Sequence, residues 1–231
     1  MKKTIGASLI CMNHVSLLED IKTCEKIGVD FIHIDIMDGS FVPRFGIYPE
    51  IVQDLSLHTN VKFDLHLMVN DIIFTAEQFL PCKNVEYVSF HLDNKTGDIY
   101  KFYDHIKAYG VKVGCVVNLS TPTFVIKSIL ADNIFDSIMF MGIHPGVLKH
   151  THRPELVIKK LQDLVSISNL PDFVQIDGGV HYHTIPDLLS HGINNLVCGS
   201  STLFHGITAE LNHLERQDLI AKNFSKILQL T

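Results

Sequence analysis

The sequence has little charge and lacks any segment that would divide it. Charged residues make up 19% of the 231 residues and hydrophobic residues 46%. The chain therefore has ample apolar side chain to bury and too little charge for a disordered protein. It has no low-complexity tract and no Pro/Gly/Ser-rich linker. Because α/β barrels reach about 200 to 250 residues as one unit, we expect a single domain over residues 1–231.

Excess positive charge and paired thiols are also absent. The formal net charge of −6 gives no extended positive field, which argues against nucleic acid or an acidic membrane as partner and favours a small molecule. The cysteines are odd in number, widely scattered and without a C-x-x-C pair, so a zinc knuckle or redox dithiol is excluded. This cysteine usage fits a reducing cytosol; the five are Cys11, Cys24, Cys82, Cys115 and Cys198.

No apolar run approaches the roughly 18 residues that a membrane span needs. The opening of the chain, Met1-Lys2-Lys3 followed by the apolar run from Ile5 to Cys11, mimics a signal peptide that ends in a lipid-modified cysteine. That run is only about seven residues long, at the bottom of the range for such peptides, and it contains Ser8. We therefore expect a cytoplasmic protein without a membrane partner.

What the chain does contain is a regular alternation of short β-rich runs with helical patterns. In residues 17–27, apolar positions recur on one helical face against charged positions on the other. Gly28, Gly110 and Gly192 each follow such a pattern, where a C′ glycine ends a helix. Alternation of this kind implies a parallel sheet, and eight repeats allow it to close into a (β/α)8 TIM barrel, in the α/β class. The expected strands are 4–10, 30–37, 61–67, 85–91, 111–117, 136–142, 173–177 and 194–198, with a terminal helix over about 211–230.

Acidic and histidine side chains collect near the ends of the apolar strands. A period of two places His33 and Asp35 on one face of the second strand, and Asp64 and His66 on one face of the third. Asp177 ends the seventh strand, and the C-terminal strand ends of a barrel surround its catalytic mouth. Buried carboxylates need a partner, and a divalent cation such as zinc, iron(II) or manganese suits this mixed N/O set. Alternatively, each is an ordinary salt-bridged strand-end residue.

Taken together, these motifs resemble those of ribulose-phosphate 3-epimerases, over nearly the whole chain from Ser8 to about Phe204. The Met-Asp-Gly-x-Phe-Val-Pro block at 37–43 is highly specific. D-allulose-6-phosphate 3-epimerases share the same framework, and Cys11-Met12 resembles them as much as the pentose enzymes. The matching blocks, in family order, are Ser8-Leu9-Ile10, 33–43, Asp64-Leu65-His66-Leu67-Met68, Lys112-Val113-Gly114, His144-Pro145-Gly146, Asp177-Gly178-Gly179 and Gly199-Ser200.

The resemblance implies a metal site and a pair of acid/base groups. It implies that Asp35 and Asp177 are the two catalytic groups, one on each side of the sugar carbon. It also implies that these two residues, together with His33 and His66, bind one divalent metal ion, which is Zn, Fe(II), Mn or Co. Inverting carbon 3 of a 2-ketose fits this set, because one carboxylate must remove a proton while a second carboxyl group returns one to the opposite face.

The resemblance also implies where the substrate is held. Ser8 is expected to contact the substrate near the metal, and three methionines to form an apolar floor, although methionine more commonly serves as core packing. The phosphate is expected at the loops after strands seven and eight, where glycines let backbone N–H groups approach it at a helix start, although a Gly-Gly pair can also mark only a turn. The expected substrate-binding residues are Ser8, Met37, Met68, Met141, Gly146, Gly178, Gly179, Gly199 and Ser200.

Two places depart from the family pattern. Family members usually continue the sixth-strand Pro-Gly with Phe-Gly-Gly-Gln, whereas residues 145–150 here read Pro-Gly-Val-Leu-Lys-His. Arg44 stands where the family commonly has asparagine. Either the basic residues of this region form a solvated surface loop, or they hold an anion by charge and shift the substrate toward a longer or doubly anionic sugar phosphate; they are Lys149, His150, His152 and Arg153.

The function expected from the resemblance is interconversion of D-ribulose 5-phosphate and D-xylulose 5-phosphate through an ene-diolate. The alternatives are epimerisation of another ketose phosphate such as D-allulose 6-phosphate, and a non-catalytic sugar-phosphate binding barrel. An orotidine-phosphate decarboxylase would need an Asp-x-Lys-x-x-Asp array, which we do not find, and a Schiff-base aldolase would need a lysine in the mouth. The candidates Lys62 and Lys112 lie at strand starts. A homo-oligomer is suggested only by the family.

Overall fold

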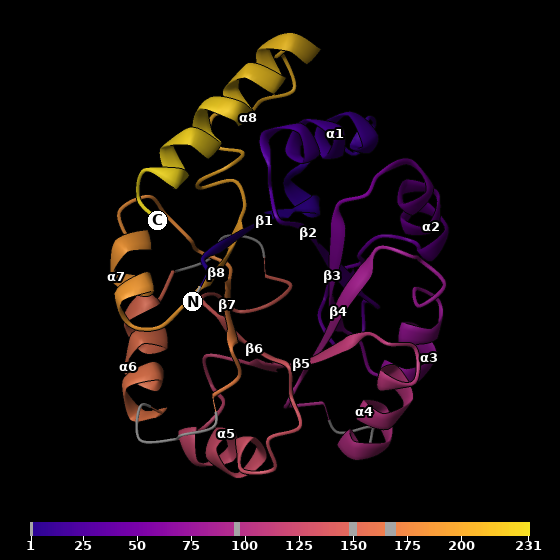
Figure 1. The fold of residues 1–231 in the computed structure, drawn as a ribbon, viewed down its shortest axis with the longest axis vertical. Helices are drawn as coiled ribbons and strands as arrows, with labels where there is room; N and C mark the ends of the chain where they lie inside the picture. Colours follow the sequence, from indigo (N-terminus) through magenta and orange to yellow (C-terminus); the bar gives the residue numbers. More distant parts are fainter. Residues whose placement is uncertain (1, 95–97, 148–151, 165–169) are drawn as a thin grey trace.

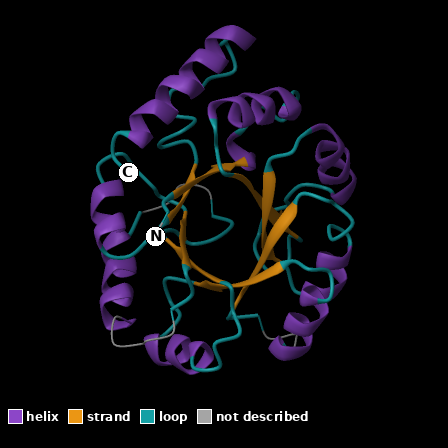
Figure 2. Ribbon diagram, viewed as in Figure 1, coloured by secondary structure: helices purple, strands orange, loops and turns teal. Residues whose placement is uncertain are grey.

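Eight parallel strands close into a barrel in a computed structural model that describes residues 2–94, 98–147, 152–164 and 170–231. The strands form a ring in chain order, and β1 pairs with both β2 and β8 (Figure 2). The predicted barrel is confirmed. The strands are β1 (Thr4–Ser8), β2 (Phe31–Met37), β3 (Lys62–Met68), β4 (Val85–His91), β5 (Lys112–Val117), β6 (Ser137–Met141), β7 (Phe173–Asp177) and β8 (Asn195–Cys198).

Helices surround the ring of strands (Figure 1). In the part of the chain that the structure describes, no helix is both long enough and apolar enough to cross a bilayer. The predicted glycines at helix ends are found: Gly28, Gly110 and Gly192 follow helices with φ values of 90°, 75° and 99°, and Gly192 comes directly after the C-cap residue His191. The helices are α1 (Leu17–Ile27), α2 (Pro49–His58), α3 (Ile72–Glu77), α4 (Ile99–Lys107), α5 (Thr123–Leu130), α6 (Pro154–Leu164), α7 (Ile185–Ser190) and α8 (His213–Leu228).

The first strand and the terminal helix have slightly different bounds from those expected. The first strand was predicted over 4–10, but β1 ends at Ser8 and a 3-10 turn, η1 (Leu9–Cys11), follows. The turn is closed by the N–H of Met12, which donates to the Leu9 carbonyl at 3.0 Å. The terminal helix begins at residue 213, because the side chains and backbones of Asn212 and Glu215 form a reciprocal capping box.

The main apolar core lies between the strands and the helices. It contains the alternate residues Ile32, Ile34 and Ile36 of β2, and the corresponding leucine and phenylalanine positions of β3. The intervening residues of both strands face the barrel interior, as the period of two predicts, and the middle ones are polar: His33 and Asp35 in β2, Asp64 and His66 in β3. Packing onto the helices therefore uses the outward faces and leaves the interior available for chemistry.

The N-terminal end of the barrel interior is filled by aromatic rings. Tyr87 stacks on Phe173 with ring centroids 4.5 Å apart, and Phe31 meets Phe173 edge-on at 5.9 Å. The ammonium of Lys112 lies over the Tyr87 ring. A side chain at Gly6 would collide with the Phe31 ring, since a Cβ there would lie 2.1 Å from it. Access to the interior is therefore from the opposite, C-terminal end.

The first and last helices are joined by a buried ion pair. Arg216 of α8 donates to Asp20 of α1, with its Nη2 2.6 Å from Oδ2 and its Nε 2.8 Å from Oδ1. The two helices lie side by side at one edge of the ring (Figure 1). Removing one partner of such a pair leaves a buried charge uncompensated, which costs about 3–5 kcal/mol. The pair therefore fastens the two ends of the chain together.

Candidate active site

Two imidazoles and two carboxylates converge at the C-terminal end of the barrel interior. Parallel pairing of β2 with β3 sets Asp35 beside His66, and β7 supplies Asp177 from across the ring. The Nε2 atom of His33 lies 3.4 Å from Asp35 Oδ1 and 3.7 Å from Asp177 Oδ2. The Nδ1 atom of His66 lies 3.1 Å and 3.5 Å from the same two oxygens. Each imidazole therefore faces both carboxylates.

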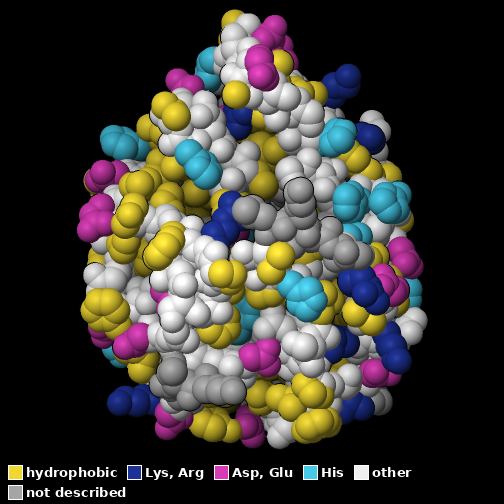
Figure 3. All heavy atoms as spheres, turned by 180° about the vertical axis from the view of Figure 1, so that it is seen from behind, with side chains coloured by type: hydrophobic (Ala, Val, Ile, Leu, Met, Phe, Trp, Pro, Cys, Tyr) yellow, Lys and Arg dark blue, Asp and Glu magenta, His cyan; other side chains and the backbone are white. Residues whose placement is uncertain are grey.

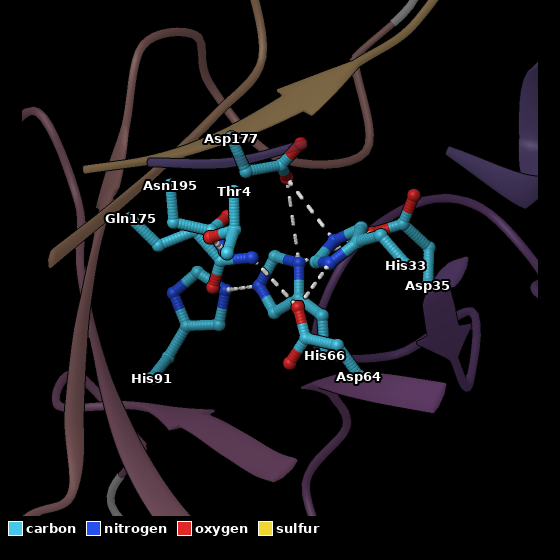
Figure 4. Close-up of polar contacts among 9 residues, drawn as sticks. All are labelled: Thr4, His33, Asp35, Asp64, His66, His91, Gln175, Asp177 and Asn195. Carbon is cyan, nitrogen blue, oxygen red and sulfur yellow. Dashed lines mark hydrogen bonds and ion pairs between the residues drawn. The ribbon is translucent and has the colours of Figure 1, made fainter. Parts of the chain in front are cut away.

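A second layer of side chains orients the two imidazoles (Figure 4). The Nδ1 atom of His33 lies 2.8 Å from Asp64 Oδ2, and the same oxygen accepts from Nε2 of Gln175 at 2.7 Å. The Nε2 atom of His66 lies 2.8 Å from Nε2 of His91. His33 Nδ1 and His66 Nε2 thus each have a hydrogen-bond partner, which directs His33 Nε2 and His66 Nδ1 toward the carboxylates.

The charges of this cluster depend on one another. Burial by itself would raise the pKa of Asp35, but the neighbouring imidazoles of His33 and His66 outweigh it and hold that pKa far below its usual range. Burial opposes protonation of His33 and His66, yet the nearby carboxylates raise the pKa of both imidazoles. Burial, followed by the neighbouring His66, lowers the pKa of His91 well below its ordinary value. The carboxylates and the two imidazoles therefore each favour the charged form of the other.

The donor set fits a divalent cation. One ligand atom from each of His33, Asp35, His66 and Asp177 lies within 4.8 Å of the others, and Nε2 of His33 is buried without a hydrogen-bond partner among the described residues. Ligand atoms about 2.0–2.2 Å from one ion lie at most roughly 4.4 Å apart, so little adjustment is needed. Two nitrogens and two carboxylate oxygens suit zinc, iron(II) or manganese. The buried cluster is consistent with a divalent metal site.

A cavity of about 430 Å³ opens beside the cluster. Asp35 and Asp177 line it, whereas His33 and His66 are fully buried beneath. The structure places every expected substrate-binding residue in its wall; these are Ser8, Met37, Met68, Met141, Gly146, Gly178, Gly179, Gly199 and Ser200. This placement gives all of them access to one small molecule.

The three methionines lie outside the main core. Met37 and Met68 pack with Val42 in one small apolar cluster, and Met141 packs with Val116 and Met139 in another. All three line the cavity and are at most 8% exposed. They therefore combine packing at the barrel mouth with an apolar surface toward the cavity.

The glycine loops reach the cavity, but not as helix starts. Gly178 and Gly179 have φ values of 84° and 67°, in the region that favours glycine. The described helix that follows, α7, begins only at Ile185, and Gly199-Ser200 is followed by hydrogen-bonded turns up to Gly206. The expectation of a helix start at these loops is therefore wrong, because local turn hydrogen bonds hold the chain instead.

The altered sixth loop is described only in part. Val147 lines the cavity, while Lys149 and His150 lie outside the described residues. Arg153 is exposed and pairs with Glu155, and it does not line the cavity. Arg44, the second departure from the family pattern, does line it, and no ion pair to its side chain occurs among the residues that the structure describes.

Sequence reasoning missed several side chains of this site. His91 ends β4 at the mouth, where the rule that drew attention to the second and third strands also applies. Gln175 lies two residues before Asp177 on the same face of β7, so the same rule would have found it. His181 lines the cavity, but it follows the glycine pair in a turn, where no periodicity signals its direction.

Comparison with known proteins agrees with this geometry. A model of the ribulose-phosphate 3 epimerase family matches residues 4–204. The ribulose-phosphate 3-epimerase of Bacillus subtilis (strain 168) is 32% identical over 203 residues, which cover 85% of this chain and 90% of that protein. The ribulose-phosphate 3-epimerase of Buchnera aphidicola subsp. Baizongia pistaciae is 31% identical over 229 residues, covering 95% and 97%.

Solved structures show the same fold at low sequence identity. A mutant tryptophan synthase alpha-subunit from Pyrococcus furiosus has a TM-score of 0.68 at 17% identity, covering 99% of this chain and 100% of that chain. A monomeric form of phosphoribosylanthranilate isomerase from Thermotoga maritima has a TM-score of 0.62 at 14% identity, covering 97% and 99%. Similarity at these identities extends to the barrel alone.

Proposed function

Because this chain belongs to the ribulose-phosphate 3-epimerase family of isomerases, we propose that it interconverts D-ribulose 5-phosphate and D-xylulose 5-phosphate. The observation that carries this proposal is the pair of carboxylates, Asp35 and Asp177, which line one cavity from strands that are not neighbours. Two carboxyl groups that reach one small molecule from different directions are what inversion at carbon 3 requires.

The proposed reaction is a proton transfer on each face of the sugar. Asp35 is assigned as the carboxylate that removes the proton from carbon 3 in one direction, because it lines the cavity from β2. Asp177 would return a proton to the opposite face, and the two groups would exchange roles in the reverse direction. Removal of the proton leaves an ene-diolate, and no oxidant or reductant takes part.

A divalent cation would be held by His33, Asp35, His66 and Asp177. When bound, it supplies positive charge that lowers the energy of the ene-diolate oxygens relative to water. Asp64 and His91 would keep the two imidazoles in the orientation needed for ligation. The methionine walls would exclude water from the reacting carbon, and Ser8, in the same cavity wall, would contact the substrate oxygens.

The test is hydrogen exchange at carbon 3. Metal-reconstituted protein is incubated in D₂O with D-ribulose 5-phosphate or with D-allulose 6-phosphate, and deuterium at carbon 3 is followed by NMR. Exchange with the pentose phosphate and appearance of D-xylulose 5-phosphate are expected. Faster exchange with the hexose phosphate would assign the chain to the longer substrate instead. Absence of exchange with either, in protein that holds its metal, would favour the non-catalytic binding barrel.

Other partners stay predictions. On the visible part of the face in Figure 3, basic and acidic side chains and histidines are interspersed with hydrophobic ones, which supports the expectation that nucleic acid is not a partner.

A homo-oligomer is proposed from the family alone, and light scattering tests it. A single domain over 1–231 predicts one cooperative unfolding transition. The cytoplasmic location is tested by fractionation of the cells.

A further inference from the structure

We propose that His152 and His181 form an imidazole pair that binds the phosphate group of the substrate in this chain. The proposal rests on the proposed function and extends it, because it assigns recognition of the anion to two side chains in addition to glycine backbone. Both residues line the same cavity as Asp35 and Asp177. A molecule with a ketose at one end and a phosphate at the other can therefore meet both groups.

The ring of His152 lies directly on the backbone of Gly179. A Cβ built on Gly179 would be 1.9 Å from His152 Nδ1, and φ at this glycine is 67°. Any other residue at 179 would therefore displace the ring. Gly179 thus leaves space for the His152 ring, in addition to its expected role of letting the backbone approach the phosphate.

The rings of His152 and His181 lie close together, and hydrogen bonds with Thr184 hold the turn that carries His181. Their ring centroids are 5.0 Å apart with planes inclined by 56°. The N–H of His181 donates to Thr184 Oγ1 at 3.1 Å, and that hydroxyl donates back to the His181 carbonyl at 2.9 Å. The backbone of His181 is therefore fixed next to the ring of His152.

The nitrogens of His152 are buried and unused. Neither Nδ1 nor Nε2 has a hydrogen-bond partner among the residues that the structure describes. The neighbouring Gly142 carbonyl accepts from the backbone N–H of Arg153 at 3.1 Å, and it also favours a proton on the His152 ring. Buried ring nitrogens without partners are costly. A small turn of the ring toward the cavity that it lines would let its N–H groups donate to the oxygens of a phosphate once the ring carries its protons.

The charges around the pair favour an anion. His181 faces His183 and His205, while His152 faces His181, His183 and Glu155. Glu155, the one carboxylate among these neighbours, is exposed and already pairs with Arg153. Burial, together with neighbouring imidazoles, lowers the pKa of both His152 and His181. A phosphate dianion placed between them would reverse that effect and be held by charge-assisted hydrogen bonds.

A metal ion fits this cluster less well than an anion. Chelation would need three ligand atoms close together, and within the described ranges only the group of His33, Asp35, His66 and Asp177 brings three or more ligand atoms within 4.8 Å of one another. The imidazoles of His152, His181 and His183 do not meet that condition. An anion needs only two donors, and this pair offers two neighbouring imidazoles that line one cavity.

The test uses the full chain loaded with metal and ring-preserving variants. His152→Phe and His181→Phe keep the ring shape and remove its nitrogens. His58→Phe is the control, because His58 is exposed at the end of α2 and does not line the cavity. Two quantities are measured: the dissociation constant of inorganic sulfate by calorimetry, and KM with kcat for D-ribulose 5-phosphate. Metal content and circular dichroism check the fold, and His→Gln variants replace any Phe variant that does not fold.

Each variant of the pair is expected to raise both the sulfate dissociation constant and KM by about tenfold or more. The value of kcat should stay within about threefold, since the phosphate does not react. The control should leave all of these unchanged. A double variant with unaltered sulfate binding and KM would overturn the proposal, as would weaker sulfate binding with an unaltered KM.

Failure of the proposed function has a different signature. If no ketose phosphate turns over in the unmodified protein, but sulfate binds and the double variant loses that binding, the anion site stands and the epimerase assignment falls. If ketose phosphate turns over while the variants behave like the control, the assignment stands and the imidazole pair falls.

Discussion

The two ends of the active-site cavity are built on different principles. At the metal end, each side chain comes from a strand, and each imidazole is held by a partner behind it, as in the pairs His33–Asp64 and His66–His91. At the other end, His152 and His181 come from loops, and the nitrogens of His152 have no partner among the described residues. The metal end is organised before any ligand arrives, whereas the anion end is completed by its ligand.

The difference shows that the strands fix the positions of the reacting groups, whereas the loops allow the residues around the substrate to vary. Strand register fixes the relative positions of Asp35 and His66, so that a change there alters the reaction itself. Loops can vary in sequence without disturbing the sheet, which is how residues 147–150 can read Val-Leu-Lys-His where the family usually has Phe-Gly-Gly-Gln. Changes at the metal end should therefore lower kcat, and changes at the anion end should raise KM.

The largest effect is expected from the acid/base pair. Asp177→Asn removes one proton-transfer group while keeping its shape, so kcat should fall by about 10²–10⁴-fold. Asp187→Asn, an exposed position on α7, is the matched control and should keep full activity. Steady-state kinetics measures both. A variant at 177 that retains most of the kcat would remove Asp177 from the mechanism.

Removing the metal should abolish turnover and also lower stability. Dialysis against a chelator is expected to leave less than about 1% of the activity, with recovery on addition of a divalent ion. A ligand present at about 1,000 times its dissociation constant stabilises the folded state by about 4 kcal/mol, so the melting temperature should fall on chelation. Differential scanning calorimetry measures this. Unchanged activity and melting temperature after verified metal loss would contradict the metal site.

A change behind the metal end should act through metal affinity. Asp64→Asn weakens the hydrogen bond that orients His33, and second-layer changes of this kind cost about 10–100-fold in metal affinity or activity. Competition with a metal-binding dye measures the affinity. Asp98→Asn is the control, because asparagine can also cap α4 at this position. Equal metal affinity in both variants would show that His33 is oriented without Asp64.

The smallest effect is the pH dependence of anion binding. Burial lowers the pKa of His152 and His181 in the folded chain. Below about pH 6.5 the unfolded chain therefore binds more protons than the folded chain, and the free energy of unfolding decreases as pH falls. Sulfate favours the protonated imidazoles, and its binding should therefore take up protons and weaken as pH rises. Calorimetry in buffers of different ionisation enthalpy measures the uptake. Proton release on binding would contradict it.

The parts of the fold that follow from short-range periodicity could be predicted from the sequence. Alternation in 31–37 and 62–68 identifies which residues face the barrel interior, and the glycines at 28, 110 and 192 mark helix ends. The convergence of His33, Asp35, His66 and Asp177 follows from the same rule once the barrel is assumed. Their number and type were sufficient to point to a cation.

What could not be predicted depends on contacts between loops. The direction of His181 is set by its hydrogen bonds with Thr184 and by the ring of His152, which no local pattern encodes. The end of β1 at Ser8 depends on a turn closed by Met12. The resemblance to the family pointed to glycine loops for the phosphate, and so directed attention away from side chains in the same wall.

The closure of the ring has a consequence for how the chain acquires its shape. The edge of β1 that pairs with β8 finds its partner 191 residues later, and Arg216 must return to Asp20 over 196 residues. During synthesis, this edge of a parallel sheet stays exposed until the last strand emerges from the ribosome. Such non-local pairing slows folding and leaves the nascent protein open to aggregation, so truncation before residue 195 should yield insoluble chains.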